Sequence, residues 1–172
     1  MTTPLTLSEL NALDEAAFVQ RLGGMFEHSP WVAQHAFGKR PFASVEALHA
    51  CMVAAIEAAG TEAQLRLIRA HPELAGKAAV RGELTQDSTR EQSGAGLNQC
   101  SPQEFAMLQQ LNADYNAKFG FPFIVAVRGH TRHSIIALFQ QRLNNTVDAE
   151  RQECLEQIYR IGQFRLSDAI KA

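Results

Sequence analysis

His71 directly precedes Pro72 and is the residue of this sequence best placed for acid–base chemistry. The proline ring crowds the residue before it out of the α region, so the apolar-periodic run of Leu65, Leu67 and Ile68 should end at or near His71. An imidazole at a helix C-terminus lies at the negative end of the helix dipole, which favours the protonated ring. Because the unperturbed pKa of histidine lies nearest neutrality, the sequence predicts His71 as a general acid.

A carboxylate follows in the segment Ser88-Thr89-Arg90-Glu91-Gln92. The spacing alone favours a capping box, in which Ser88 and Glu91 each bond to the backbone N–H of the other. The alternative is that a short helix presents the Glu91 carboxylate and its own N-terminal N–H groups to a cleft, where they could bind an anion. A carboxylate beside a histidine can fix the tautomer of the ring or share its proton.

His130 and His133 have a spacing that would suit a metal pair, but no acidic residue or third ligand lies near them in the sequence. The favoured interpretation is therefore that they are solvated or capping histidines. The chain also contains no phosphate-binding glycine loop, no G-x-S-x-G and no H-E-x-x-H. Its motifs thus do not support cofactor-dependent chemistry.

Arg165 lies between Phe164 and Leu166 near the end of the chain. By itself this pattern is typical of a surface arginine whose stem covers apolar neighbours. The alternative is an arginine in a cleft, whose guanidinium grips a carboxylate with two parallel hydrogen bonds.

Helical periodicity and capping residues predict an all-α fold. Asp14, Ser44 and Ser101 are the predicted N-caps, and Gly120 is a predicted helix stop. Residues 76–100 are irregular in composition and predict only short helices. One predicted helix begins at Ser29-Pro30-Trp31. The others cover residues 15–22, 45–59, 61–71, 102–119, 131–145 and 147–169.

The segment Phe121-Pro122-Phe123-Ile124-Val125-Ala126-Val127 is the exception, because it is apolar, partly β-branched and contains a proline. It predicts a buried strand or a core loop, yet no second convincing strand exists to pair with it. Buried peptide groups without partners cost about 1–3 kcal/mol each. We expect helix ends, or a ligand rich in amide groups, to supply these partners.

The length of 172 residues predicts one domain spanning residues 1–172. A formal net charge of −2 gives no basic field for nucleic acid or an anionic membrane, and no apolar run is long enough to span a bilayer. We expect no secretory signal. Cys51, Cys100 and Cys154 are odd in number and form no C-x-x-C pair, which argues against a disulfide framework and a thiolate zinc site. A reducing, cytoplasmic compartment fits best.

Three motifs together resemble one enzyme family. They are His71-Pro72-Glu73-Leu74-Ala75, Ser88-x-x-Glu91-Gln92-x-x-Ala95-Gly96-Leu97 and Lys118-Phe119-Gly120-Phe121-Pro122-Phe123-Ile124. In this order they resemble OHCU decarboxylase, which acts on 2-oxo-4-hydroxy-4-carboxy-5-ureidoimidazoline (OHCU) in uric acid degradation. The resemblance covers nearly the whole chain, and the three motifs together are far more specific than any one alone.

The resemblance implies an all-α fold of its own type, a homodimer, no cofactor and a small ureide as substrate. It makes His71 the catalytic acid or base and Glu91 its partner. The lack of a peroxisomal C-terminal tail leads us to expect a bacterial, cytoplasmic member. The residues that would line the substrate site are Pro72, Ser88, Thr89, Arg90, Gln92, Phe123, Ile124, Val125, Ala126 and Val127, with Arg165 as a cationic group.

The implied chemistry accounts for the absence of a cofactor motif. In the substrate, the carbon that loses CO₂ is next to a ring C=N that can accept the electron pair. An apolar site would help the carboxylate to leave as neutral CO₂, and protonation on one face would give (S)-allantoin. The alternatives are a ureide- or purine-binding module without catalysis, a helical interaction protein and, less well supported, a metal-dependent hydrolase.

Overall fold

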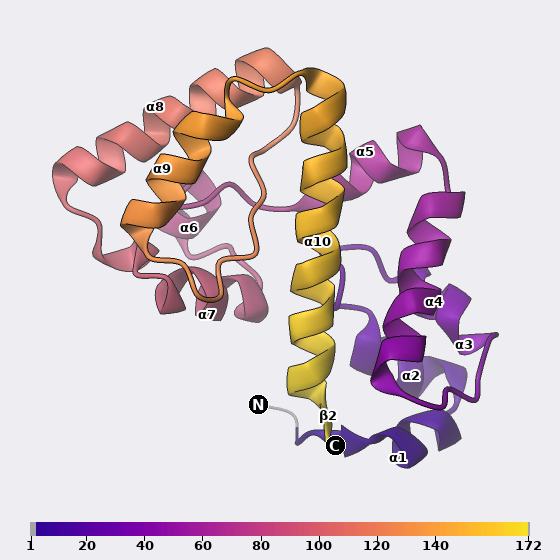
Figure 1. The fold of residues 1–172 in the computed structure, drawn as a ribbon. Coiled ribbons are helices and arrows are strands. Elements are labelled where there is room, and N and C mark those ends of the chain that lie inside the picture. The colour runs from indigo at the N-terminus through magenta and orange to yellow at the C-terminus, as the bar shows by residue number, and fades with distance from the viewer. Residues whose placement is uncertain (1–2, 172) are drawn as a thin grey trace. The chain divides into compact units, whose positions relative to one another are not determined.

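The computed structural model describes residues 3–171, and helices dominate this part of the chain (Figure 1). Its α-helices are α1 (Leu7–Ala12), α2 (Glu15–Leu22), α3 (Trp31–Phe37), α4 (Val45–Ala58), α5 (Thr61–Ala70), α6 (Lys77–Arg81), α7 (Gln86–Gly94), α8 (Pro102–Phe119), α9 (Arg132–Arg142) and α10 (Val147–Ala169). The short 3-10 helix η1 (Leu97–Gln99) follows α7, and β1 (Leu5–Thr6) pairs in parallel with β2 (Ile170–Lys171). The predicted all-α fold class is confirmed.

The three predicted N-caps are also confirmed. The side chains of Asp14, Ser44 and Ser101 each accept a hydrogen bond from the backbone N–H three residues further on, at 2.8, 3.0 and 3.1 Å. Gly120 ends α8 with a φ of +76°, a left-handed conformation that glycine adopts without strain. Local cap chemistry therefore sets the ends of these helices as the sequence indicates.

Two other predicted helix starts are wrong. The N-cap of α7 is Thr85, whose hydroxyl accepts a hydrogen bond from Ser88 N at 3.2 Å, so Ser88 lies inside the helix and is not its cap. Thr85 competes for the same role three residues earlier. At α3 the cap position is Pro30, which has no side-chain cap bond, because the Ser29 hydroxyl instead donates to the carbonyl of Glu27 at 3.0 Å.

The described chain divides into two compact units. The first comprises residues 3–70 and 158–171, and so contains α1 to α5, both strands and the later part of α10. Its buried side chains come from every one of these helices and include Leu10, Phe18, Val32, Met52, Ile68 and Leu166. Within this unit α10 approaches Phe26 so closely at Gly162 that an added Cβ would lie 2.6 Å from the Phe26 ring, which explains the glycine.

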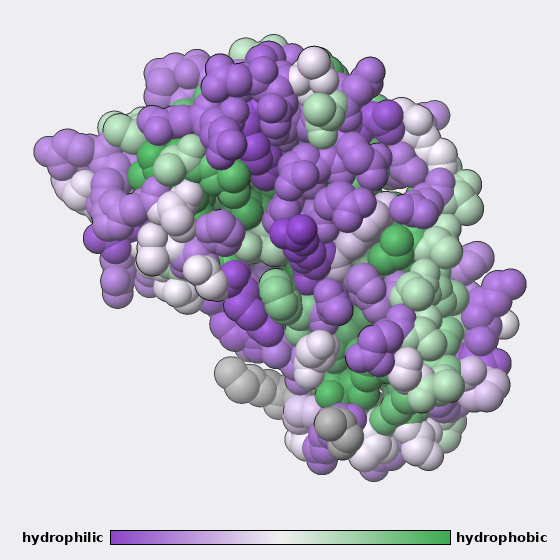
Figure 2. All heavy atoms as spheres, viewed as in Figure 1, coloured by the Kyte–Doolittle hydropathy of each residue, from purple (hydrophilic) through white to green (hydrophobic). Residues whose placement is uncertain are grey.

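The second unit comprises residues 71–157, from α6 to the first part of α10. Its core is an aromatic cluster around Tyr115, whose ring centroid lies 4.4–6.0 Å from those of Phe119, Phe121, Phe123 and Phe139. The surface over α8 and α9 is mostly hydrophilic on the face that Figure 2 shows. The assignment of residues 1–172 to one domain stays a prediction. Among residues 3–171, no helix combines the length and the apolar character that crossing a bilayer requires.

Replacing the Ser101 cap should destabilise the protein measurably. Ser101 and Glu104 form a reciprocal capping box at the start of α8, so Ser101→Ala should lower the free energy of unfolding by about 1 kcal/mol. Urea unfolding followed by circular dichroism measures this change. Ser167→Ala, at an exposed helical position of α10, is the matched control and should be close to neutral. Equal stability losses in the two variants would contradict the capping role.

Candidate functional site

His71 directly follows the last residue of α5 and begins a loop that leads to α6. The side chain is 7% exposed. Four residues on, Ala75 has a φ of +49°, a left-handed conformation that a residue with a Cβ adopts only at a cost. A loop that contains such a residue needs strong contacts to hold it in one conformation.

Gln92 of α7 provides one set of these contacts. Its Oε1 accepts a hydrogen bond from Ala75 N at 2.9 Å, and its Nε2 donates to the carbonyl of Glu73 at 3.3 Å. Gln92 is buried and was predicted to bind substrate. Both ends of its side-chain amide therefore bond to the His71 loop, and Gln92 directly follows Glu91 in the sequence.

Three amide side chains of α8 hold the loop from another helix. Gln109 donates to the carbonyl of Ala75 at 2.7 Å, Asn112 to the carbonyl of Leu74 at 3.0 Å, and Asn116 to the Glu73 carboxylate at 2.6 Å. Sequence reasoning missed these residues as part of the site. The available signal was their spacing of i, i+3 and i+7, which places three amides on one face of a helix.

α7 carries the predicted residues 88–92 on different sides. Ser88 and Gln92 are buried and Glu91 is half-buried, whereas Thr89 and Arg90 are exposed. The Thr89 hydroxyl donates to the carbonyl of Thr85 at 2.9 Å, and Arg90 pairs with Asp87 at 3.0 Å on the surface. Residues three or four positions apart share a helix face, so Ser88 and Glu91 lie on one flank of α7 and Thr89 and Ser93 on another.

The segment 121–127 is buried throughout and has no strand partner within the described residues. Arg142 of α9 donates from Nη1 to the carbonyl of Ile124 at 2.6 Å, and Gln157 of α10 accepts from Ala126 N at 3.0 Å. The carbonyl of Val127 accepts from His130 N at 2.9 Å. Helix side chains thus hold the middle of the segment, where we expected helix ends to supply the partners.

Val125 lies between the two residues that the helices hold. Neither its N–H nor its C=O forms a hydrogen bond with any residue from 3 to 171, although the residue is buried. In an extended chain the peptide groups of alternate residues point to opposite edges, and Ile124 and Ala126 alternate with Val125. The segment therefore offers one donor and one acceptor, side by side, to a ligand with complementary amide groups.

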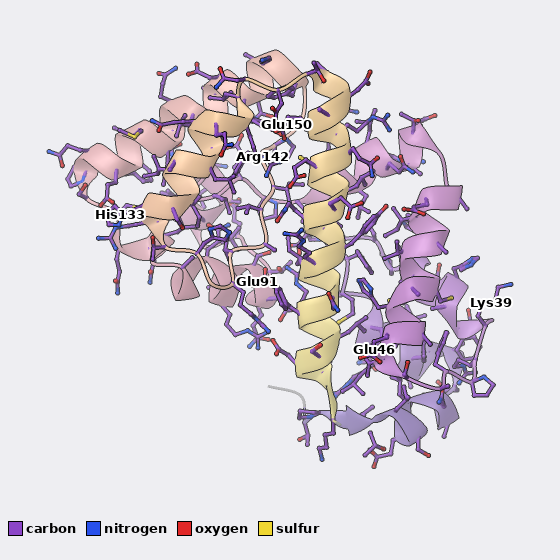
Figure 3. The ribbon with its side chains drawn as sticks, in the orientation of Figure 1. Lys39, Glu46, Glu91, His133, Arg142 and Glu150 are labelled. Carbon is purple, nitrogen blue, oxygen red and sulfur yellow. The ribbon has the colours of Figure 1, made fainter. Side chains whose placement is uncertain are left out.

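Arg142 belongs to a buried polar cluster with Glu150, Tyr115 and Cys154. Figure 3 shows Arg142 and Glu150 next to each other, and their closest N···O distance is 2.7 Å. Burial opposes the charge of Arg142, but its hydrogen bonds to Glu150 prevail and raise the pKa of the guanidinium. Burial, together with Cys154 and Glu150, raises the pKa of the Tyr115 phenol, and burial raises the pKa of the Cys154 thiol. At neutral pH the cluster therefore contains a cationic arginine beside a neutral phenol and a neutral thiol.

Arg165 lies on the part of α10 that belongs to the first unit. It is only 3% exposed, so the interpretation as a surface arginine is wrong. Its Nη1 lies 2.8 Å from the Glu27 carboxylate and 3.1 Å from the carbonyl of Gly24. A partner 138 residues away in the sequence thus explains why this charge can be buried.

His130 and His133 each have a local polar partner. His130 Nδ1 lies 3.0 Å from the Ser134 hydroxyl, and His133 Nε2 lies 3.1 Å from the Glu104 carboxylate. The fold thus brings Glu104, which is distant in the sequence, close to His133, and His133 is exposed as expected for a solvated histidine. Within residues 3–171, no three histidine, cysteine, aspartate or glutamate side chains lie together as a metal site requires.

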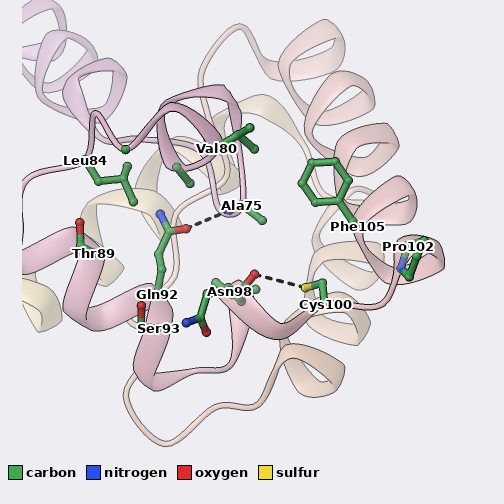
Figure 4. A pocket seen from close by; sticks show the side chains of 13 residues that line it. Ala75, Val80, Leu84, Thr89, Gln92, Ser93, Asn98, Cys100, Pro102 and Phe105 are labelled. Carbon is green, nitrogen blue, oxygen red and sulfur yellow. Dashed lines mark hydrogen bonds between the residues drawn. The ribbon is translucent and has the colours of Figure 1, made fainter.

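A cavity of about 530 Å³ lies beside α7, within the second unit (Figure 4). Thr89 and Gln92 are the only predicted site residues that line it, and no charged side chain takes part in its wall. Val80, Leu84 and Phe105 give it a mainly apolar surface. It lies on the Thr89 and Ser93 flank of the helix.

Comparison with known proteins places this geometry in a family. The family model described as OHCU decarboxylase matches residues 11–167. The chain is 39% identical over 164 residues to 2-oxo-4-hydroxy-4-carboxy-5-ureidoimidazoline decarboxylase of Haloferax volcanii, covering 95% of both chains. It is 36% identical over 168 residues to a human protein named as a putative enzyme of the same kind, covering 98% of this chain and 97% of that one. It also matches the uric acid degradation bifunctional protein PucL of Bacillus subtilis at 41% identity, over 96% of this chain but 33% of that protein.

Solved structures agree with these matches. The crystal structure of an (S)-allantoin synthase aligns with a TM-score of 0.78 at 28% identity, over 96% of this chain, which spans about half (54%) of that longer chain. A crystal structure of OHCU decarboxylase in the presence of (S)-allantoin aligns with a TM-score of 0.68 at 18% identity and supports the fold alone. From the family model and these relatives, the chain belongs to the OHCU decarboxylase family.

Proposed function

We propose that this protein decarboxylates OHCU to (S)-allantoin without a cofactor. The observation that carries the proposal is the match over nearly the full length to relatives that are named for this reaction. The geometry supports it, because the loop that begins with His71 is hydrogen-bonded to the helix that carries Glu91. We propose that the protein acts as a cytoplasmic homodimer, as the family resemblance implies.

His71 is the proposed acid or base, and Glu91 is its proposed partner. As the bond to the departing CO₂ breaks, its electron pair passes into the adjacent ring C=N, and the resulting enol-like intermediate must then take up a proton on one face. A buried imidazole on a restrained loop can move the proton of the substrate hydroxyl or deliver that final proton. The Glu91 carboxylate would fix the orientation of the ring.

The main chain of residues 123–127 is the proposed recognition element for the ureide group. A ureide has adjacent N–H and C=O groups, and the Val125 peptide groups form the complementary pair. The buried apolar side chains of the segment would exclude water from the carboxylate and so favour its loss as neutral CO₂. Pro72, Ser88, Thr89, Arg90 and Gln92 complete the proposed lining.

Arg165 is the proposed cationic group for the substrate carboxylate. Its pairing with Glu27 holds the guanidinium in place, and an arginine can bind a carboxylate through two parallel hydrogen bonds.

Replacing His71 should abolish most of the activity. General acid–base catalysis contributes about 10²- to 10⁴-fold, so His71→Ala should lower kcat by a factor in this range. The unstable substrate is generated from urate in situ, and the formation of one allantoin enantiomer is followed by circular dichroism. His35→Ala, at an exposed position on α3, is the control and should retain full activity.

Two results would decide against these roles. Racemic allantoin formed by the wild type at the uncatalysed rate would reject the decarboxylase. In that case calorimetric binding of allantoin would favour a ureide-binding module. Normal turnover by a folded His71→Ala variant would reject the acid–base role of His71 while leaving the reaction in place.

Glu91→Gln tests the partner of His71 separately. The amide keeps the size of the side chain but loses its negative charge, so it would orient the imidazole less well and would no longer stabilise the protonated ring. We expect kcat to fall by about 10- to 10³-fold with KM changed less than threefold. Steady-state kinetics measure both constants, and Glu83→Gln, at an exposed position before α7, is the control. An unchanged kcat in Glu91→Gln would rule out the proposed role.

A further inference from the structure

The buried ion pair between Arg142 and Glu150 contacts the segment 123–127 through Arg142, which bonds to the carbonyl of Ile124. Glu150 is fully buried and Arg142 is 4% exposed. Three nitrogen–oxygen contacts of 2.7–3.0 Å join the Arg142 Nε and Nη2 atoms to the two Glu150 carboxylate oxygens. Tyr115 donates a further hydrogen bond to Glu150 at 2.7 Å, and Asn145 donates another at 3.0 Å.

Stability alone gives little reason to keep such a pair. Well-packed apolar residues of similar volume often stabilise a fold as well as a buried ion pair or better, because both charges must lose their water. What distinguishes this pair is how it orients the Arg142 guanidinium. Glu150 occupies Nε and Nη2 of the guanidinium, which turns Nη1 toward the carbonyl of Ile124 at 2.6 Å.

Gln157 holds the same segment two residues further along. Its Oε1 accepts from Ala126 N at 3.0 Å, and its Nε2 donates to the Glu153 carboxylate at 2.8 Å. The contact with Glu153 fixes which end of the amide faces the segment, because only the oxygen can accept the Ala126 N–H. Arg142 therefore holds the carbonyl of Ile124, and Gln157 holds the N–H of Ala126, on either side of Val125.

We infer that Arg142 and Gln157 are positioning residues for ureide recognition, which hold Ile124 and Ala126 so that the Val125 peptide groups face the ligand. Neither residue touches the substrate. This inference rests on the proposed function, since it assumes that a ureide binds at this edge. It adds that the ion pair with Glu150 and the contact with Glu153 serve the affinity for substrate.

The test separates affinity from chemistry. Gln157→Met keeps the length of the side chain but removes the acceptor for Ala126 N–H, which should raise KM about 5- to 10-fold. Because Val125 would hold the ureide equally in the ground and transition states, kcat should change less than twofold. This pattern is the reverse of the one expected for His71→Ala.

The rescue variant is the exchange Gln157→Glu with Glu153→Gln. It keeps an acceptor facing Ala126 N–H and a donor on position 153, with the net charge unchanged, so KM should return to within about twofold of wild type. Gln152→Met makes the same chemical change at an exposed position of α10 and should leave both constants unaltered. If Gln157→Met does not fold, as thermal unfolding would show, Gln157→Asn withdraws the acceptor by one methylene and should give the same rise in KM.

Calorimetry with (S)-allantoin reports on the same edge without turnover. The Kd for allantoin should rise with KM in Gln157→Met and recover in the exchange variant. A wild type that binds allantoin but does not decarboxylate would refute the proposed function and still allow this comparison. Wild-type KM and Kd in a folded Gln157→Met or Gln157→Asn variant would overturn the inference.

Discussion

The proposed chemistry depends on how the loop from His71 to Gly76 is held. Ala75 adopts a left-handed conformation that its Cβ disfavours, and hydrogen bonds from two helices act on its two peptide groups. Gln92 takes the N–H and Gln109 takes the C=O. Each bond contributes about 1 kcal/mol net, which is comparable to the cost of the conformation. Because both helices act on one residue, neither α7 nor α8 can move without loosening the loop that carries the histidine.

In the second unit, the buried non-helical segment 121–127 also has peptide groups that need hydrogen-bond partners outside regular secondary structure. A sheet would satisfy such a segment along both edges, whereas here side chains of α9 and α10 satisfy part of it. The aromatic rings fix its side chains at the same time, since Phe123 stacks on Phe139 at 3.9 Å. Helix side chains and ring stacking therefore hold the segment, while the Val125 peptide groups form no hydrogen bond with residues 3–171. In both the loop and the segment, amide or guanidinium side chains replace the backbone partners that regular secondary structure would provide.

What the sequence could predict follows from the range of the interactions. The caps at Asp14, Ser44 and Ser101 act over three residues, so they are visible in the sequence, and the ends of α8 and α10 could be read from it. The pattern at Ser88 wrongly favours a cap because Thr85 offers the same hydroxyl three residues earlier. Arg165 was ambiguous because Glu27 lies 138 residues away. The anchors Arg142 and Gln157 lie 18 and 31 residues from the atoms they hold, and no local pattern distinguishes them from other polar residues on a helix.

The arrangement of α7 separates two kinds of site on one short helix. Thr89 and Ser93 line a cavity without a charged side chain, and a carboxylate moved from water into such a cavity would lose its hydration without gaining a cationic partner. This cavity is therefore poorly suited to an anionic ligand. Gln92 lies between the two flanks and binds the His71 loop with both ends of its amide. Since the same side chain lines the cavity and restrains the loop, the shape of the apolar cavity and the position of the histidine depend on each other.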